Sequence, residues 1–167
     1  MSDPVGEVHP QFSDPAATAR PWSEIVEVLD GAEIFWLSTT RGDGRPHVTP
    51  IPSVWHDGRL HIATGAAEQK AKNLARDPRC ILTTGTPTLN AGLDLVVEGT
   101  VERVTDQATL QQLATMWKDQ LDWDFEVTDD GFADHGSRNA IVYAVNAQKL
   151  LAFGKGDPFS QTRYRFA

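Results

Sequence analysis

Apolar and polar residues alternate along several short segments of the chain, which is the pattern of β-strands with one buried face. Residues 59–64 are the clearest example, with Leu60, Ile62 and Thr64 on one face. Six or seven antiparallel strands at hairpin spacing, with a few helices between them, predict a mainly β fold, a small β-barrel. The other strands are expected at residues 34–40, 45–55, 80–84, 93–104, within 139–151 and at 162–166.

Three segments carry helix signals instead. Residues 106–120 have an apolar stripe at helical spacing, and Thr105 is the expected cap. Residues 22–30 form a shorter predicted helix with Ser23 as its N-cap. A third helix is expected at residues 67–76, where the following Asp-Pro pair ends it.

Some positions interrupt these periods. Pro50 and Pro52 lie inside the strand expected at residues 45–55 and cannot donate ladder hydrogen bonds. They predict an edge or irregular segment whose neighbouring backbone groups are available to a ligand. Gly99 suggests a β-bulge. Residues 121–137 are acidic, aromatic and without a period, so they are expected to be irregular.

Length and composition limit the domain organisation, partners and compartment that the protein can have. The 167 residues suffice for one domain with a full core, and the net charge of −8 argues against nucleic acid as a partner. No apolar run is long enough to span a bilayer, and one cysteine allows no internal disulfide, which suits the cytoplasm. Residues 1–20 are expected to be a flexible N-terminal arm, and residues 21–167 a single domain.

The strongest candidate site joins a strand end to a helix start. Thr64 ends one predicted strand, and Lys70, Lys72 and Asn73 follow on the short basic helix. A hydroxyl, helix amides and ammonium groups in this order form a cradle for a phosphate-tailed, ring-shaped cofactor. The alternative is a solvated helix whose lysines bind nothing.

The histidines and the cysteine carry weaker signals. His47, His56 and His61 lie close in sequence but lack a metal-binding spacing, so they are expected to be sheet residues and no metal site is predicted. Cys80 is expected to be a small core residue. The sequence names no catalytic acid or base.

Several motifs in one order resemble the flavin-binding split-barrel superfamily, which includes the pyridoxamine 5'-phosphate oxidases. Within it, the chain is most similar to the actinobacterial oxidoreductases that use the deazaflavin coenzyme F-420. The resemblance runs from about Ile34 to the end of the chain. The motifs are Ser38-Thr39-Thr40, Asp43-Gly44-Arg45-Pro46, His47-Val48-Thr49-Pro50, Thr64 followed by Lys70-Ala71-Lys72-Asn73-Leu74 and Asp77-Pro78, and Thr162-Arg163-Tyr164-Arg165-Phe166.

This resemblance implies a split β-barrel, FMN-binding and pyridoxamine-phosphate-oxidase-like, that acts as a homodimer on a small molecule. It implies an oxidoreductase in which F-420, or alternatively FMN, transfers a hydride to an unsaturated acceptor. It also implies that the strand from Thr49 to Ser53 lines the cofactor ring. The expected cofactor-binding residues are Thr49, Pro50, Ile51, Pro52, Ser53, Thr64, Gly65, Lys70, Lys72 and Asn73.

One departure bears on the choice of cofactor. Flavin-binding members of the superfamily often carry a Ser-Arg pair just before the lysine, where this chain has Glu68 and Gln69. The departure favours F-420 over FMN. A non-enzymatic module that binds a flavin or haem stays open as an alternative. Trp36, Trp55 and Val97 are expected to lie on sheet surface that a second subunit covers.

Overall fold

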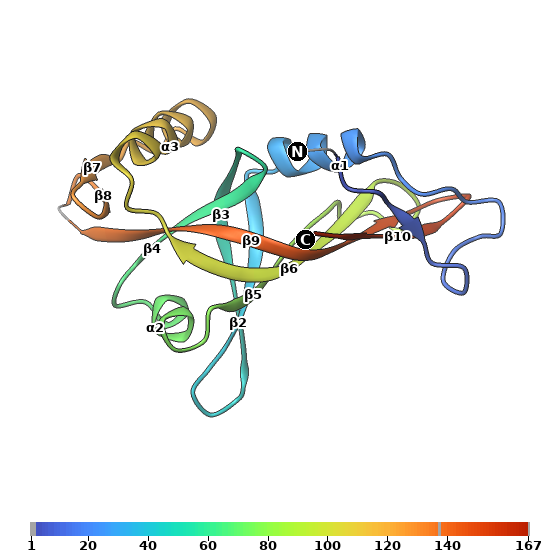
Figure 1. The fold of residues 1–167 in the computed structure, drawn as a ribbon, viewed down its shortest axis with the longest axis horizontal. Helices are drawn as coiled ribbons and strands as arrows, with labels where there is room; N and C mark the ends of the chain where they lie inside the picture. The colour runs from blue at the N-terminus through green and yellow to red at the C-terminus, as the bar shows by residue number, and fades with distance from the viewer. Residues whose placement is uncertain (1–2, 137, 167) are drawn as a thin grey trace.

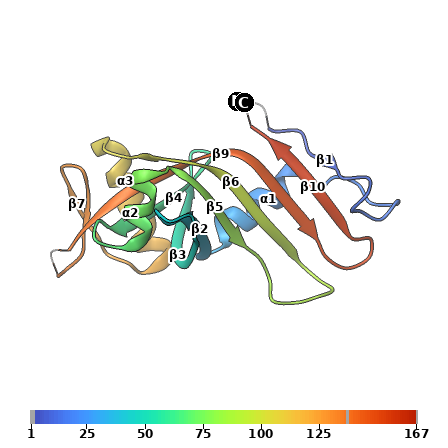
Figure 2. The ribbon, with the colours of Figure 1, turned by 90° about the horizontal axis from the view of Figure 1, so that it is seen from below.

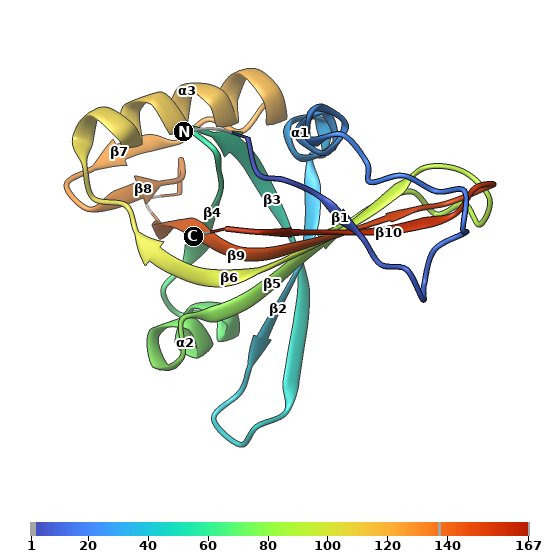
Figure 3. The same cartoon turned by 45° about the vertical axis from the view of Figure 1, so that its right-hand side comes forward.

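The computed structural model describes residues 3–136 and 138–166, and its centre is a closed antiparallel β-barrel (Figures 1 and 3). Hydrogen-bonded neighbours follow the order β9-β4-β3-β2-β5-β6, and β6 pairs with β9 to close the ring. The predicted mainly β barrel is therefore confirmed. The barrel strands are β2 (Ile34–Thr40), β3 (Pro46–His56), β4 (Arg59–Gly65), β5 (Arg79–Thr84), β6 (Leu93–Arg103) and β9 (Asn139–Gly154).

Three helices surround the barrel in the described residues: α1 (Trp22–Gly31), α2 (Gln69–Arg76) and α3 (Gln107–Leu121). None of them is long and apolar enough to cross a membrane. All three were expected, but two caps were placed wrongly. Pro21, not Ser23, precedes α1, and Asp106, not Thr105, caps α3 by accepting the Thr109 N–H at 2.8 Å. A carboxylate one residue nearer the helix reaches its free amides better.

The N-terminal segment, expected as a flexible arm, lies along the edge of the sheet in the described residues (Figure 2). Strand β1 (Glu7–Val8) pairs antiparallel with β10 (Ser160–Arg165), which continues the sheet beyond β9. The Ser13 hydroxyl accepts the Gln161 N–H at 2.9 Å, and the Arg20 N–H donates to the Thr162 hydroxyl at 3.0 Å.

Residues 121–137, expected to be irregular, contain a small hairpin. Strands β7 (Glu126–Thr128) and β8 (Gly131–Ala133) pair with each other, and β8 also pairs with β9. Each strand has only three residues, too few for an alternating pattern to be visible in the sequence. In Figure 1 the hairpin and α3 lie together at one end of the barrel.

Two features of the barrel strands follow the sequence expectation. From Pro46 to Pro52, β3 pairs with β2 in the described chain, and its pairing with β4 begins only at Ser53. Pro50 and Pro52 thus lie on a strand with one free edge. The predicted bulge is confirmed, since the β6–β9 register shifts between Glu98 and Gly99.

Buried side chains form two clusters. One fills the barrel, with Phe35, Leu37, Ile62 and Leu82 among its members. The other lies between α3 and the outside of the barrel and includes Trp117 and the residues Val54, Leu110, Leu113, Phe132 and Val142. Because α3 packs outside the barrel, a hollow remains between its C-terminal end and the end of β4.

Candidate functional site

The hollow beside α3 is a cavity of about 670 Å³. Three expected cofactor-binding residues, Pro52, Thr64 and Gly65, line it. The remaining lining residues are Ala63, Ala66, Ala67, Glu68, Trp117, Trp123, Phe125, Asp134, Arg138, Asn139 and Ala140. The cavity thus meets the strand end at which the sequence predicted a phosphate cradle.

The cradle is built at the turn between β4 and α2. The Gly65 N–H donates to Glu68 Oε1 at 2.9 Å, and the Glu68 N–H donates back to the Gly65 carbonyl at 3.0 Å. Lys70 Nζ forms an ion pair with Glu68 Oε2. Thr64 is 2% exposed, and its hydroxyl has no hydrogen-bond partner in the described residues. A buried hydroxyl, a backbone amide and an ammonium group therefore come together here, as a phosphate requires.

Burial and charge differ between the two ionic groups of the cradle. The side chain of Lys70 is 12% exposed, whereas that of Glu68 is 50% exposed. Burial raises the pKa of Glu68, but Lys70, the Gly65 N–H and the nearby Thr64 hydroxyl outweigh it and hold the pKa below its usual range. Glu68 is consequently ionised at neutral pH.

The expected ligands on α2 do not line the cavity itself. Lys70 reaches its edge through the ion pair with Glu68. Asn73 is buried, donates to the Thr39 hydroxyl at 2.9 Å and accepts from Gln69 at 2.8 Å. Its amide nitrogen thus ties α2 to β2, and its amide oxygen is used within α2. Lys72 is exposed on the helix.

The side chains of β3 alternate between the two faces of the strand. Ile51 and Ser53 are buried in the barrel, and the Ser53 hydroxyl donates to the His61 carbonyl at 3.0 Å. The Thr49 hydroxyl is also buried, without a partner in the described chain. Pro50 is exposed, and Pro52 is the one residue of this run that lines the cavity.

The free edge of β3 presents carbonyl groups. The Ser53 N–H donates to the Glu33 carbonyl, toward the β2 side. Because successive residues of a strand point their backbone groups in opposite directions, the carbonyls of Pro50 and Pro52 point to the free edge. Proline has no N–H. At these two positions the edge therefore accepts hydrogen bonds and donates none.

Aromatic side chains that were not among the predicted site residues, Trp117, Trp123 and Phe125, also line the cavity. The ring of Trp123 stacks on Phe125, with centroids 5.5 Å apart and planes 16° from parallel. Asp122 ends α3 in the left-handed conformation, and the Trp123 N–H then donates to the Trp117 carbonyl at 3.2 Å. This turn holds Trp123, 46% exposed, at the cavity. The sequence could have indicated this part of the site through the several aromatic residues that lie between positions 117 and 132.

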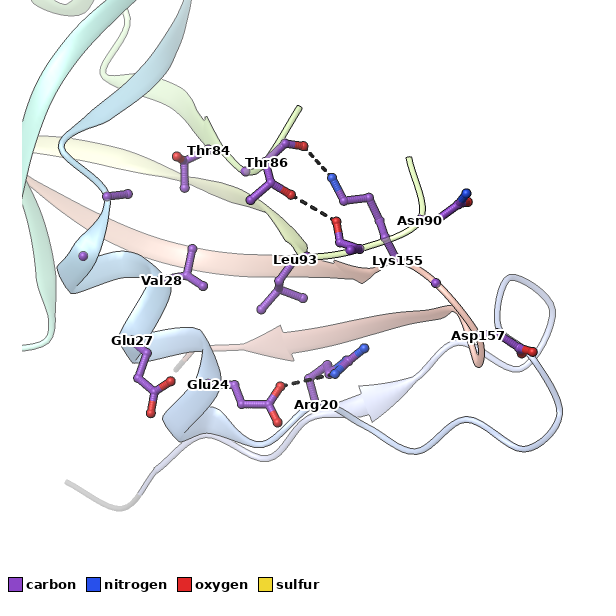
Figure 4. A pocket seen from close by; sticks show the side chains of 16 residues that line it. Arg20, Glu24, Glu27, Val28, Thr84, Thr86, Asn90, Leu93, Lys155 and Asp157 are labelled. Carbon is purple, nitrogen blue, oxygen red and sulfur yellow. Dashed lines mark hydrogen bonds and ion pairs between the residues drawn. The ribbon is translucent and has the colours of Figure 1, made fainter. Parts of the chain in front are cut away.

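A larger cavity of about 890 Å³ lies at the other end of the molecule, between α1 and the loops after β5 and β9 (Figure 4). Lys155 donates to Asp94 at 2.8 Å and to the Thr86 carbonyl, and Arg20 pairs with Glu24 at 3.4 Å. These cations are already neutralised by acidic neighbours, and no expected site residue lines the cavity. We therefore assign the candidate site to the smaller cavity.

Cys80 and His47 lie outside the candidate cavity. Burial raises the pKa of the Cys80 thiol to about 12, so it stays protonated at neutral pH, and Cys80 packs in the barrel core as expected. Burial, together with Arg41 and Lys70, lowers the pKa of His47.

Comparison with known proteins shows the family to which this barrel belongs. The family described as pyridoxamine 5'-phosphate oxidase matches residues 22–151. The chain belongs to this family, which confirms the resemblance to the split-barrel flavin-binding superfamily. No curated protein resembles the chain closely enough to count as a match.

Solved structures of several differently named proteins share the fold. One called an F420 reductase is 22% identical with a TM-score of 0.56, covering 74% of this chain and 94% of its own. A pyridoxamine 5'-phosphate oxidase-related, FMN-binding protein from Nostoc punctiforme is 16% identical with a TM-score of 0.61, covering 90% and 94%. A haem-binding protein from Mycobacterium smegmatis is 16% identical with a TM-score of 0.61, covering 86% and 59%.

Proposed function

We propose that this protein is an oxidoreductase that uses coenzyme F-420 to transfer a hydride to an unsaturated small molecule. The observation that carries the proposal is the charge of the cradle. Lys70 is its cation, and Glu68 already balances it. Arg138, which also lines the cavity, is likewise paired, with Asp134 at 2.8 Å. Such a site suits the single charge of the F-420 phosphodiester better than the dianion of FMN. The structural similarity to a protein named F420 reductase supports the same choice.

The remaining walls suit a flat, partly polar ring. The Pro52 carbonyl lies at the cavity and the Pro50 carbonyl further along the same free edge of β3, where each would accept a hydrogen bond from a ring N–H. Trp123 and Phe125, which stack on each other, give the cavity an apolar surface. When bound, reduced F-420 supplies the hydride, and these residues orient its ring and hold its phosphate.

FMN is the second candidate cofactor, favoured by the similarity to the FMN-binding protein from Nostoc punctiforme. A haem-binding module receives less support from the site. None of the described residues that line the cavity is a histidine, and the buried His61 of β4 lies outside it. The residues described around this cavity therefore include no histidine that could be an axial ligand of haem.

The test of this proposal is anaerobic incubation of the protein with reduced F-420 and an α,β-unsaturated ketone. We expect F-420 to be reoxidised faster than in a protein-free control. Tight binding of F-420 without reoxidation across a panel of unsaturated acceptors would instead favour the binding module. Turnover with FMN alone would favour the FMN-dependent alternative.

Trp123→Ala is expected to weaken binding of F-420 by about 0.5–1.5 kcal/mol, because an aromatic contact with the ring is lost. Trp123→Phe should keep most of the affinity. Since Trp123 is half-exposed, neither variant should lower the melting temperature strongly. Isothermal titration of both variants measures the effect. If wild type and Trp123→Ala bind F-420 equally well, Trp123 does not contact the cofactor.

We also propose that the protein is a homodimer. Trp36 is 51% exposed and lies opposite Pro50 and Thr83 on the outside of β2. Three more apolar side chains are exposed beside it on β2, β3 and β5: Ile34, Val48 and Ile81. We call this surface, with Trp36, the outer β2 face. Of the other residues expected to be uncovered, Val97 is only 3% exposed and Trp55 packs on the core, so that part of the expectation is wrong. Both side chains belong to the core cluster that fills the barrel or pack against it, so they are not available to a second subunit.

Trp36→Asp is expected to shift the protein from dimer to monomer, because a carboxylate would be buried in an apolar interface. Light scattering at micromolar concentration measures the mass. Leu89→Asp, on an exposed loop, is the matched control and should stay dimeric. A wild-type monomer that still binds cofactor would contradict the dimer.

A further inference from the structure

Glu68 places its own carboxylate on the groups that form the cradle. One carboxylate oxygen accepts the Gly65 N–H at 2.9 Å, and the other pairs with Lys70 Nζ. Two oxygens of a bound phosphate would use these same two donors. The Thr64 hydroxyl, buried and without a partner in the described chain, lies beside them. The side chain of Glu68 therefore mimics an anionic ligand.

A local role in helix capping does not account for this arrangement. Glu68 is the residue before α2, where a side chain ordinarily accepts an amide of the first helical turn. The carboxylate makes no such hydrogen bond and turns back to Gly65 instead. A Cβ at position 65 would lie 3.3 Å from Glu68 Oε1, so any larger residue there would crowd this hydrogen bond.

Of the two ionic groups, Glu68 is the one able to leave. Its side chain is half-exposed and can turn into water, whereas the largely buried Lys70 keeps its need for an anion. A ligand that brings its own anion to Lys70 and Gly65 thus exchanges with Glu68. The displaced carboxylate stays near the site, so it repels a doubly charged phosphate more strongly than a singly charged one.

We propose that Glu68 is a built-in competitor for the anionic group of the cofactor and sets the charge of phosphate that the cradle accepts. This inference rests on the proposed cofactor site. Glu68 must leave Gly65 and Lys70 before a phosphate binds, and it selects a singly charged phosphodiester over a phosphomonoester dianion.

The experiment compares FMN with riboflavin, which has the same ring without phosphate. Glu68→Gln keeps an oxygen that can accept the Gly65 N–H but removes the charge that neutralises Lys70. We expect FMN to bind about tenfold tighter to Glu68→Gln than to wild type at low salt. Riboflavin affinity should not change. Fluorescence quenching of the flavin measures both.

Glu98→Gln is the matched control, because Glu98 pairs with Lys149 at 2.7 Å and lines neither cavity. It should leave both affinities unchanged. Glu68→Ser, which also removes the carboxylate and adds a hydroxyl, is expected to tighten FMN binding like Glu68→Gln and serves if the glutamine variant does not fold.

Three results would overturn the inference: an unchanged ratio of FMN to riboflavin affinity in both Glu68 variants, weaker binding of both flavins, or no FMN binding by any variant. The first two leave the F-420 turnover test untouched, so the proposed function can stand without this inference. Conversely, tighter FMN binding by Glu68→Gln together with absent F-420 turnover would support the inference and reject the proposed function.

Discussion

Lys70→Ala is expected to weaken the binding of both F-420 and FMN by about 1.5–3 kcal/mol, or roughly 10- to 150-fold. The ammonium group is largely buried and pairs with Glu68, whose other carboxylate oxygen accepts the Gly65 N–H of the cradle. Its removal also leaves the ionised Glu68 without its counter-charge, which adds repulsion. Isothermal titration calorimetry of the variant with each cofactor measures the loss.

The control for this variant is Lys149→Ala. Lys149 is also ion-paired to a glutamate, Glu98, but lies away from the cavity. Its removal should leave both affinities within about twofold of wild type. If Lys70→Ala binds both cofactors as tightly as wild type, Lys70 does not hold the phosphate, and the assignment of the cavity as the cofactor site is wrong.

The protein is expected to lose stability as the pH falls from about 6.5 to 4, because His61 takes up a proton in the unfolded chain but resists it inside the fold. His61 is buried, and neither ring nitrogen has a hydrogen-bond partner in the described residues. Burial, with smaller contributions from Arg59 and His56, lowers its pKa to about 4. Asp57 and the Arg59 backbone oppose the shift only weakly.

The sign follows from proton binding. Between these two pKa values the unfolded chain binds a proton at His61 and the folded chain does not, so the free energy of unfolding falls as the pH falls. The loss reaches about 2.5 kcal/mol at pH 4.5 and about 3 kcal/mol below pH 4. Above about pH 7.5 His61 is almost entirely neutral in both states and contributes little pH dependence.

Urea unfolding at pH 7.5 and pH 4.5 measures this effect. Other groups also titrate in this range, so His61→Leu gives the comparison: its loss between the two pH values should be smaller than that of wild type by about 2.5 kcal/mol. His135→Leu, at an exposed histidine, should behave like wild type. If His61→Leu and wild type lose equal stability, His61 is not the group responsible.

Most of the fold was predictable because its elements are long and regular. The alternation of residues 59–64 and the proline-bearing strand before them indicated the barrel strands within a residue or two. The β7–β8 hairpin and β1 escaped because each strand has only two or three residues and depends on pairing with β9 or β10. Such pairing is a tertiary property that no local period reveals.

The site was predictable only along one stretch of chain. Thr64, Gly65 and Lys70 are close in sequence, so their spacing alone indicated a cradle. Trp123, some sixty residues later, reaches the same cavity because α3 packs outside the barrel and ends in a left-handed turn. The engagement of Glu68 with Gly65 and Lys70 likewise depends on the turn after β4, although the residue itself stood out in the sequence.

The central claim, that the cavity beside Thr64 and Lys70 is built for F-420, is tested most directly by titrating the wild-type protein with F-420 and FMN side by side. Fluorescence at low salt should show tighter binding of F-420, with a preference that shrinks as salt rises and screens the exposed charges. Equal or tighter binding of FMN, with FMN co-purifying from the expression host, would contradict the F-420 assignment.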